Sequence, residues 1–444
     1  MHALVLLTLF SSMVAEGAAA VPGAPALLKF VPEMLAVVLT LCVLFEGIRS
    51  GFDVTAKYWI ALGAMAFIIT CGLITNSVGA GPVVAGLRYY LRWVPLFLAP
   101  AVFRFNEQQI RQQLLALVAL GLAQIPIAGY QRWVVWSAER FSGDDVRGTV
   151  NDSGVLSIIL ICMVLVLTGY FMHKRIKKLP YLTLFFLLLL PTTINETKAT
   201  VLLLPAGLLT AIVIAAPRGR RLGILLGSAG LMVVFLAILI PVYDKMNENN
   251  PYKNERSIVD FFTDQNRMAT YMENKQAVAL GTKRDVRRGD AIAVPLQYLA
   301  RDPIYLAFGL GMGNVSRSSM GEQFTGNYYS LFQRFVITDF SVFLLELGVL
   351  GTGLVFVLYW LIFSDTLAVA RLDTGMTGAF AAGWVGVVVV VTAGTFYSVM
   401  HTYASISYLF WYGSGIIAAR RAQLLYSSQS SRTSDLRMQR SRVA

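Results

Sequence analysis

Charged residues are scarce in this sequence. Asp, Glu, Lys and Arg make up 14% of its 444 residues, whereas 56% of the residues are hydrophobic. A soluble domain has about 25% charged residues, because its surface must carry side chains that water solvates. The shortage therefore excludes a soluble globular enzyme and a disordered chain. It predicts an all-α polytopic membrane protein, since helices satisfy their own backbone hydrogen bonds in hydrocarbon.

Cysteine and histidine are also rare. The sequence has three cysteines, Cys42, Cys71 and Cys162, and three histidines, His2, His173 and His401. Each cysteine lies within an apolar run and none has metal-ligand spacing, which excludes a disulfide framework and a metal cluster. No Ser–His–Asp pattern and no Walker loop is present. Any chemistry must therefore use a substrate that brings its own leaving group, and we expect no cofactor.

Long apolar runs, by contrast, recur along the whole chain. Twelve of them are long enough to cross about 30 Å of hydrocarbon as helices. They lie near residues 2–20, 32–48, 57–75, 84–103, 112–131, 154–173, 180–194, 198–216, 222–243, 340–363, 377–399 and 404–419. The predicted organisation is nine spans in residues 1–243, a large folded cap at 244–339, three spans in residues 340–419 and a basic tail at 420–444.

The connections between these runs alternate in charge. Lys and Arg number 18 in one set, which comprises 49–57, 104–111, 173–178, 217–221, 364–376 and the tail from Arg420. The short connections of the other set, with Lys198 included, carry only five. Positively charged connections stay in the cytoplasm, so we expect both termini there and the cap outside. The net charge of +12 then reflects topology rather than binding to nucleic acid.

The first apolar run has two interpretations. Met1–Ala26 combines an apolar stretch with small residues, as a cleaved signal peptide does, but it lacks a basic start. We favour a retained helix over cleavage. Either interpretation leaves the topology of the remaining chain unchanged.

Two arginines lie within the fourth run. Arg88 and Arg92 are four residues apart, which places both guanidinium groups on one helix face. A charge inside the bilayer costs at least about 2.5 kcal/mol, so its presence calls for a reason. One reason is a pyrophosphate clamp, because planar guanidinium groups bind phosphate oxygens in pairs. The alternatives are pairing with an intramembrane acid and extension towards the outer interface.

Two further basic residues stand at the outer ends of runs. Lys198 follows Glu196 in a short turn, where it forms a local ion pair or presents a cation at the mouth of the bundle. Arg147 precedes Asn151 and Asp152, either of which can cap the next helix. Arg147 is then a solvated loop charge or a contact for an anion.

A buried acid and a glycine-rich turn complete the unusual features. Glu346 lies about one-third of the way into the tenth run, where it could pair with one of the arginines; we favour such structural pairing over the alternative, a catalytic role. Gly309–Asn314 (GLGMGN) superficially resembles a dinucleotide fingerprint, but no βαβ unit surrounds it. It predicts a tight turn, whose backbone N–H groups could face an anion.

Several of these stretches, in this order, resemble the bacterial O-antigen ligase and polymerase superfamily. The main match runs from Arg288 through GDAIAVPLQYLARDPIYLAFGLGMGNVSRS, an arginine followed by an amphipathic helix and a GxGxGN turn. Further matches are LELGVLGTG (345–353), RGTVNDSGVLS (147–157), ETKATVLLLPAG (196–207) and LFWYGSGIIAA (409–419). With the layout of twelve apolar runs and one large outer loop included, the resemblance extends over most of the chain.

The resemblance implies a type C glycosyltransferase in the bacterial inner membrane. Such proteins transfer a glycan from an undecaprenyl-pyrophosphate donor on the periplasmic face and need no nucleotide sugar. Their outer arginines bind the pyrophosphate, which here corresponds to Lys198, Arg288 and Arg147. The implied partners are the lipid-linked oligosaccharide, membrane lipids, and a chain-length regulator and a flippase of the same pathway.

One departure from the family favours a polymerase. Ligases carry a His-Asn-like pair at the places that Ile337 and Thr338 occupy here. Asp339 or His401 could instead act as the general base towards the acceptor hydroxyl. We therefore predict a polymerase that joins lipid-linked repeat units. The alternatives are a ligase that moves finished glycan to another acceptor and a transporter without chemistry, for which symmetric halves are expected but absent.

Overall fold

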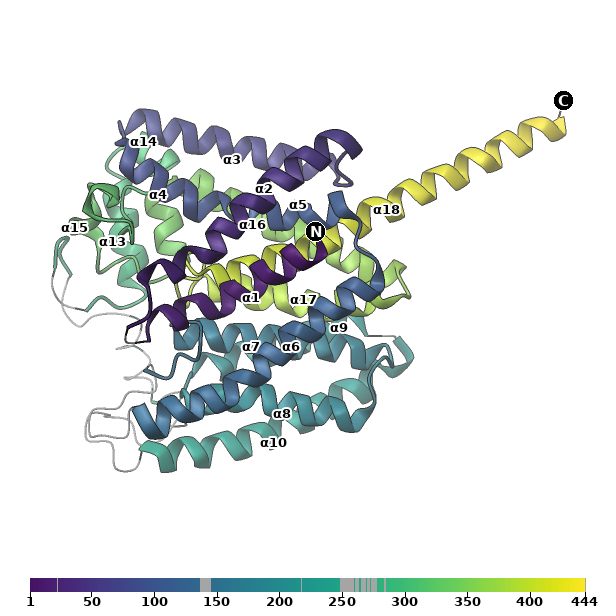
Figure 1. Cartoon of the computed structure of the whole chain (residues 1–444), viewed down its shortest axis with the longest axis horizontal. Coiled ribbons are helices and arrows are strands. Elements are labelled where there is room, and N and C mark those ends of the chain that lie inside the picture. The colour runs from purple at the N-terminus through teal and green to yellow at the C-terminus, as the bar shows by residue number, and fades with distance from the viewer. Residues whose placement is uncertain are drawn as a thin grey trace.

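The computed structural model describes residues 1–21, 23–135, 145–216, 218–247 and 285–443, together with residues 259, 263, 264, 269, 272 and 278–282. No strand occurs among these residues. Much of the predicted cap between residues 248 and 284 lies outside them. Figure 1 shows one helical bundle, with α13–α15 at one end and α18 projecting from the other. We call these the cap end and the tail end.

All twelve predicted apolar runs are helical, although two of them are interrupted, the fourth at Arg92 and the tenth at Gly348. The helices are α1 (His2–Ala19), α2 (Val31–Ser50), α3 (Ala56–Thr75), α4 (Ala80–Leu91), α5 (Val94–Phe103), α6 (Glu107–Tyr130), α7 (Ser153–Met172), α8 (Lys178–Ile194), α9 (Ala199–Ala215), α10 (Arg221–Asn247), α13 (Asp290–Leu299), α14 (Pro303–Phe308), α15 (Tyr329–Phe332), α16 (Asp339–Leu372), α17 (Met376–Gly394) and α18 (Ala404–Val443).

The apolar helices are those of a polytopic membrane protein. In the part of the chain that the structure describes, eight helices are long and apolar enough to cross a membrane: α1, α2, α3, α6, α7, α10, α16 and α17. Three shorter apolar helices, α5, α8 and α9, accompany them. The predicted count of twelve spans stays a prediction.

The fourth predicted span, 84–103, is not one helix. It is divided into α4 and α5, with Arg92 and Trp93 between them. Pro95 stands in the first turn of α5. Proline offers no backbone N–H, so Pro95 cannot donate to the Leu91 oxygen and the helical hydrogen bonding of α4 is not continued into α5. The break holds Arg92 beside the connection between α17 and α18.

Helix α7 forms the centre of the bundle. Nearly all its residues are buried, and it packs against α17, α8 and α9. Gly169 of α7 faces Gly383 of α17, and a Cβ atom on Gly169 would lie 2.4 Å from the Gly383 nitrogen. The two backbones therefore approach closely. In lipid the hydrophobic effect does not drive helices together, so close van der Waals packing at small residues stabilises their contact instead.

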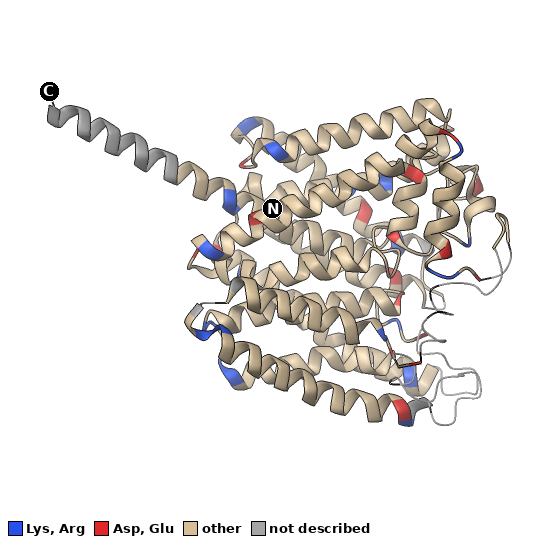
Figure 2. Ribbon diagram, turned by 180° about the vertical axis from the view of Figure 1, so that it is seen from behind, with Lys and Arg blue, Asp and Glu red and all other residues tan. Residues whose placement is uncertain are grey.

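Basic residues gather at the tail end. Figure 2 shows Lys and Arg around this end, whereas most Asp and Glu lie at the cap end together with further basic residues. Figure 1 places the start of α1 towards the tail end, where α18 also leaves the bundle. The basic connections that alternate along the sequence thus lie together at the tail end of the bundle.

The cap is joined to α16 through a break in that helix. Gly348 has φ 66° and ψ −170°, which is not helical, and a Cβ atom there would lie 2.4 Å from the Ala307 oxygen. The backbone N–H of Leu310 donates a hydrogen bond to the Leu345 oxygen over 2.7 Å. The glycine-rich turn therefore inserts against α16 rather than standing open to solvent.

Candidate functional site

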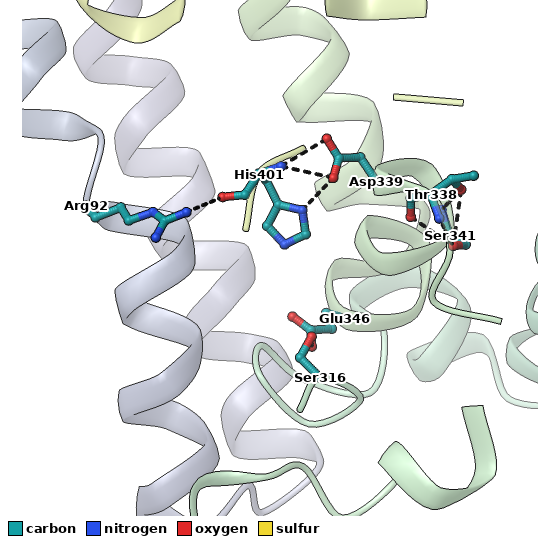
Figure 3. Close-up of polar contacts among 7 residues, drawn as sticks. All are labelled: Arg92, Ser316, Thr338, Asp339, Ser341, Glu346 and His401. Atoms are coloured by element: carbon teal, nitrogen blue, oxygen red, sulfur yellow. Dashed lines mark hydrogen bonds and ion pairs between the residues drawn. The ribbon is translucent and has the colours of Figure 1, made fainter. Parts of the chain in front are cut away.

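Asp339 and His401 form a hydrogen-bonded pair at the cap end of the bundle. The Asp339 Oδ1 atom lies 2.6 Å from His401 Nδ1, and the backbone N–H of His401 donates to both carboxylate oxygens over 3.1 and 3.3 Å (Figure 3). Asp339 is 1% exposed. Both residues were predicted as candidate bases, and the fold brings them together.

The local sequence fixes Asp339 in place. It is the first residue of α16, and Thr338 before it is the N-cap. The Ser341 backbone N–H donates to the Thr338 hydroxyl over 3.1 Å, and the Thr338 N–H donates to the Ser341 hydroxyl over 3.3 Å (Figure 3). This reciprocal capping box orients the first turn of the helix. The Asp339 N–H in turn donates to the Ser398 oxygen over 3.0 Å.

The pair has the geometry of a general base. A carboxylate that accepts from Nδ1 places the imidazole proton on that nitrogen, by inference from the hydrogen bond. The lone pair then lies on Nε2, which is buried and has no hydrogen-bond partner. A nitrogen in this state can take a proton from a hydroxyl group, and the carboxylate stabilises the imidazolium that results.

Aromatic rings and Arg92 surround the histidine. The rings of Phe343 and Tyr90 lie 5.0 and 5.5 Å from the imidazole centroid, and that of Tyr89 lies 6.3 Å away. Arg92 donates from Nη2 to the His401 backbone oxygen over 2.9 Å (Figure 3). Asp339 therefore fixes the imidazole ring of His401, and Arg92 fixes the backbone of the same residue.

Arg88 and Arg92 share one acid, Glu33 of α2. Their nitrogens lie 2.6 and 3.2 Å from the same oxygen, Glu33 Oε1. The Arg92 side chain is only 5% exposed. The predicted common face of the two arginines is confirmed, and the contact is the ion pair with an intramembrane acid that the sequence left open. The sequence did contain an indication of this partner, because Glu33 is an acidic residue at the start of an apolar run.

A polar pocket of about 370 Å³ lies next to the pair. We call it the arginine pocket; its lining is Arg147, Asn151, Asp152, Ser153, Gly154, Arg288, Ile337, Tyr397, Ser398 and Tyr403. It thus brings together the two predicted anion contacts from distant parts of the chain. Two lining residues connect this pocket to Asp339. The Ser398 oxygen accepts the Asp339 backbone N–H, and Ile337 directly precedes Thr338, the N-cap residue of α16.

Each arginine of the pocket is oriented by its neighbours. Arg288 Nε donates to the Tyr397 oxygen over 3.2 Å, and its guanidinium carbon lies 4.8 Å from the Tyr397 ring centroid. Arg147 lies 3.5 Å from Asp145, and its backbone N–H donates to Gln131 Oε1 over 3.0 Å. Stacking and backbone contacts reduce the freedom that each side chain would lose on binding an anion.

Asp152 and Tyr403 form the acidic side of the arginine pocket. Asp152 is the N-cap of α7 as predicted, since its Oδ1 atom accepts from the Val155 N–H over 2.7 Å. Its other oxygen accepts from the Tyr403 hydroxyl over 3.3 Å. Burial raises the pKa of the Tyr403 hydroxyl and the Asp152 charge raises it further, so this hydroxyl stays protonated and donates.

Lys198 stands at the end of the turn between α8 and α9, where it is the N-cap residue of α9. The turn is anchored below the arginine pocket, because Asn195 donates to the oxygen of the pocket residue Ser153 over 3.0 Å. Glu196 forms an ion pair of 3.1 Å with Arg132, a contact that the sequence did not indicate. Lys198 is therefore not part of the pocket lining, although the turn to which it belongs contacts the pocket residue Ser153.

Glu346 is bound by the glycine-rich turn rather than by an arginine. Its Oε1 atom accepts from the Ser316 hydroxyl over 2.7 Å and from the Val315 N–H over 3.4 Å (Figure 3). The carboxylate is 1% exposed. The predicted anion facing this turn is thus a side chain of the protein itself, and Glu346 connects the cap to α16.

A second polar pocket, of about 470 Å³, lies on the Tyr89 side of the histidine. We call it the serine pocket; its lining is Tyr89, Arg317, Ser318, Ser319, Gly321, Glu322 and Thr325. Arg88 donates to the Ser319 hydroxyl over 2.9 Å, which ties this part of the cap to α4. An aromatic ring among hydroxyl and charged groups is a surface that suits a sugar.

No group of three or more His, Cys, Asp or Glu side chains that could hold a metal ion occurs among the described residues. Comparison with models of protein families and with curated protein sequences gives no match to this chain. The features of this chain that bear on its function are therefore the Asp339–His401 pair and the two polar pockets near it.

Proposed function

We propose that this protein is a polysaccharide polymerase, which transfers a glycan from an undecaprenyl-pyrophosphate donor to a lipid-linked repeat-unit acceptor. The observation that carries the proposal is the Asp339–His401 pair beside a pocket with two oriented arginines. A base and an anion site within one apolar bundle are the two elements that such a transfer needs.

The arginine pocket is assigned to the pyrophosphate of the donor. Arg147 and Arg288 present planar guanidinium groups that match phosphate oxygens, and Lys198 is proposed as a further cation from the turn that contacts the pocket residue Ser153. Negative charge grows on the pyrophosphate as the sugar leaves. Cations that are already oriented stabilise this charge without reorganisation, which is the main electrostatic contribution of enzymes to catalysis.

His401 is assigned as the general base. The acceptor hydroxyl attacks the anomeric carbon of the donor, and its proton passes to Nε2 of His401. The bond between the anomeric carbon and the phosphate oxygen breaks, and the lipid pyrophosphate leaves with the electron pair. Asp339 stabilises the imidazolium formed in this step.

The serine pocket is assigned to the acceptor sugar, because its lining residue Tyr89 neighbours the His401 imidazole and offers a ring for stacking. Arg88 and Arg92 then support the wall between the two pockets rather than clamp the pyrophosphate. In this arrangement donor and acceptor meet at His401.

The proposed setting is the bacterial inner membrane, with the cap end in the periplasm and both termini in the cytoplasm. The basic tail end supports this orientation, since Lys and Arg are retained on the cytoplasmic side. Lipid-linked repeat units would arrive there through a flippase, and a chain-length regulator would be a further partner.

The test is reconstitution of the purified protein in liposomes with undecaprenyl-pyrophosphate-linked repeat units as the sole substrate. A ladder of multiples on a gel is expected from the wild type and not from His401→Gln. Consumption of substrate only after a different acceptor is added would make the protein a ligase. Intact substrate recovered on the opposite leaflet would make it a transporter.

A further inference from the structure

A third cavity, of about 420 Å³ and with mostly apolar walls, lies between α6, α7, α17 and α18, apart from the candidate site. Its apolar lining includes Leu117, Val166, Trp384 and Leu409, of which Trp384 is only 2% exposed. The cavity therefore reaches from the surface of the bundle into its interior. We call it the tail-end cavity.

The mouth of the tail-end cavity carries two arginines. Arg111 belongs to the second turn of α6, and Arg175 lies in the basic connection between α7 and α8. Both residues are exposed. Glu107 also lies at the mouth, but its carboxylate accepts the backbone N–H of Met376 over 3.3 Å. Its charge is thus directed to the start of α17, and the two guanidinium groups leave a net positive rim.

We propose that the tail-end cavity binds an anionic phospholipid, with one acyl chain among the apolar side chains and the headgroup phosphate at Arg111 and Arg175. An apolar cavity of this size does not hold ordered water, because water needs polar partners, and it accepts hydrocarbon instead. Basic pockets between helices on the cytoplasmic side bind acidic headgroups. Two arginines bind an anionic headgroup such as phosphatidylglycerol better than phosphatidylcholine, because the choline group of the latter brings its own cation to the phosphate.

The occupant is assigned as a membrane lipid and not as the substrate of the proposed transfer. The arginine pocket lies at the cap end, near the start of α7, while Arg175 follows the end of α7 at the tail end. The 20 residues of α7 separate the two sites by about 30 Å. One lipid pyrophosphate cannot contact both, so the tail-end cavity is a separate site.

Native mass spectrometry of the full-length protein in detergent tests the proposal. Phosphatidylglycerol and phosphatidylcholine with identical chains are added in turn, and retained lipid is counted. We expect one phosphatidylglycerol per protein and at least about tenfold weaker retention of phosphatidylcholine. Equal retention of the two lipids would overturn the assignment of the headgroup.

Variants locate the bound lipid. Arg111→Gln with Arg175→Gln should weaken phosphatidylglycerol binding about tenfold or more, and Val166→Phe should remove it by filling the cavity. The matched control is Arg49→Gln, an exposed arginine in the last turn of α2 that does not line the cavity. Unchanged binding in Val166→Phe would contradict the proposal.

Cross-linking of the wild type gives a result that does not depend on how the variants fold. Phosphatidylglycerol with a diazirine near the end of one acyl chain should label peptides of α6, α7 and α17 that contain cavity residues such as Val166 or Trp384. Labelling confined to other helices would overturn the site. Competition by undecaprenyl phosphate would instead assign the cavity to the polyprenyl lipid.

Discussion

The imidazole Nδ1 of His401 lies 2.6 Å from Oδ1 of Asp339, although 62 positions separate the two residues in the chain. Asp339 begins α16, and His401 lies in the connection before α18. The contact thus joins the first residue of α16 to the loop that follows α17. Its chemical consequence is a histidine with one nitrogen held and the other unpartnered.

Replacing the carboxylate of this pair tests whether it serves catalysis. Asp339→Asn keeps the shape of the side chain but can no longer stabilise an imidazolium, and its amide can favour the wrong tautomer. We expect glycosyl transfer to fall about 10²- to 10⁴-fold. The measurement is the rate of ladder formation in liposomes, with the melting temperature as a control for folding. An active Asp339→Asn protein would remove the pair from the mechanism.

Arg288 and Arg147 test the donor site. Arg288→Lys and Arg147→Lys keep the charge but lose the paired N–H groups, so we expect kcat/KM for the lipid-linked donor to fall about tenfold or more in each. The matched control is Arg334→Lys, an arginine of the cap that is 49% exposed and pairs with Asp285 over 3.4 Å. If all three variants behave alike, the arginine pocket is not the donor site.

Substitution of Glu33 tests its ion pairs with Arg88 and Arg92, the second of which binds the His401 backbone. Glu33→Gln leaves Arg88 and Arg92 without the carboxylate they share, and a charge that stays buried without its partner costs about 3 kcal/mol or more. Denaturant unfolding in detergent should show this loss. Glu46→Gln, whose partner Arg49 is 75% exposed, should change stability by less than about 1 kcal/mol. A matching loss in both variants would argue against a special role of Glu33.

Two glycines of α16 provide a matched comparison of backbone strain. Gly348→Ala forces a residue with a Cβ atom to adopt φ 66°, 2.4 Å from the Ala307 oxygen, and should destabilise the protein by about 2 kcal/mol or more. Gly353→Ala places its Cβ in open space and should stabilise the helix by up to about 1 kcal/mol. Limited proteolysis of the cap should follow the same order. Equal stability of the two variants would contradict the proposed junction between cap and α16.

Much of the fold follows from local patterns in the sequence. Apolar length predicted helices at every run, and the acid at position 152 was recognised as a candidate cap because Asp accepts backbone N–H groups at helix starts. The break at Arg92 was missed, since the run remains apolar on both sides of it. Pro95 was the available signal, because proline has no backbone N–H to donate to the preceding helical turn.

The candidate site was only partly predictable. Arg147, Asp339 and His401 stood out as charged or titratable residues next to apolar runs, whereas Arg288 was singled out only through the resemblance to the O-antigen ligase and polymerase superfamily. The sequence could not say that the two arginines share a pocket or that Asp339 and His401 share a hydrogen bond. Tyr397, Ser398 and Tyr403 of the pocket were missed, since hydroxyl residues near a helix end are common.

The sequence by itself determined which segments are helices in hydrocarbon and which ends of them are basic. Both follow from the solvent that each segment meets, a property that composition and short-range spacing record. Only the tertiary structure decided which charges meet: Glu33 with Arg88 and Arg92, Glu346 with Ser316, and Asp339 with His401. These contacts depend on the order and rotation in which helices pack, and that is set by the close fit of side chains from distant segments.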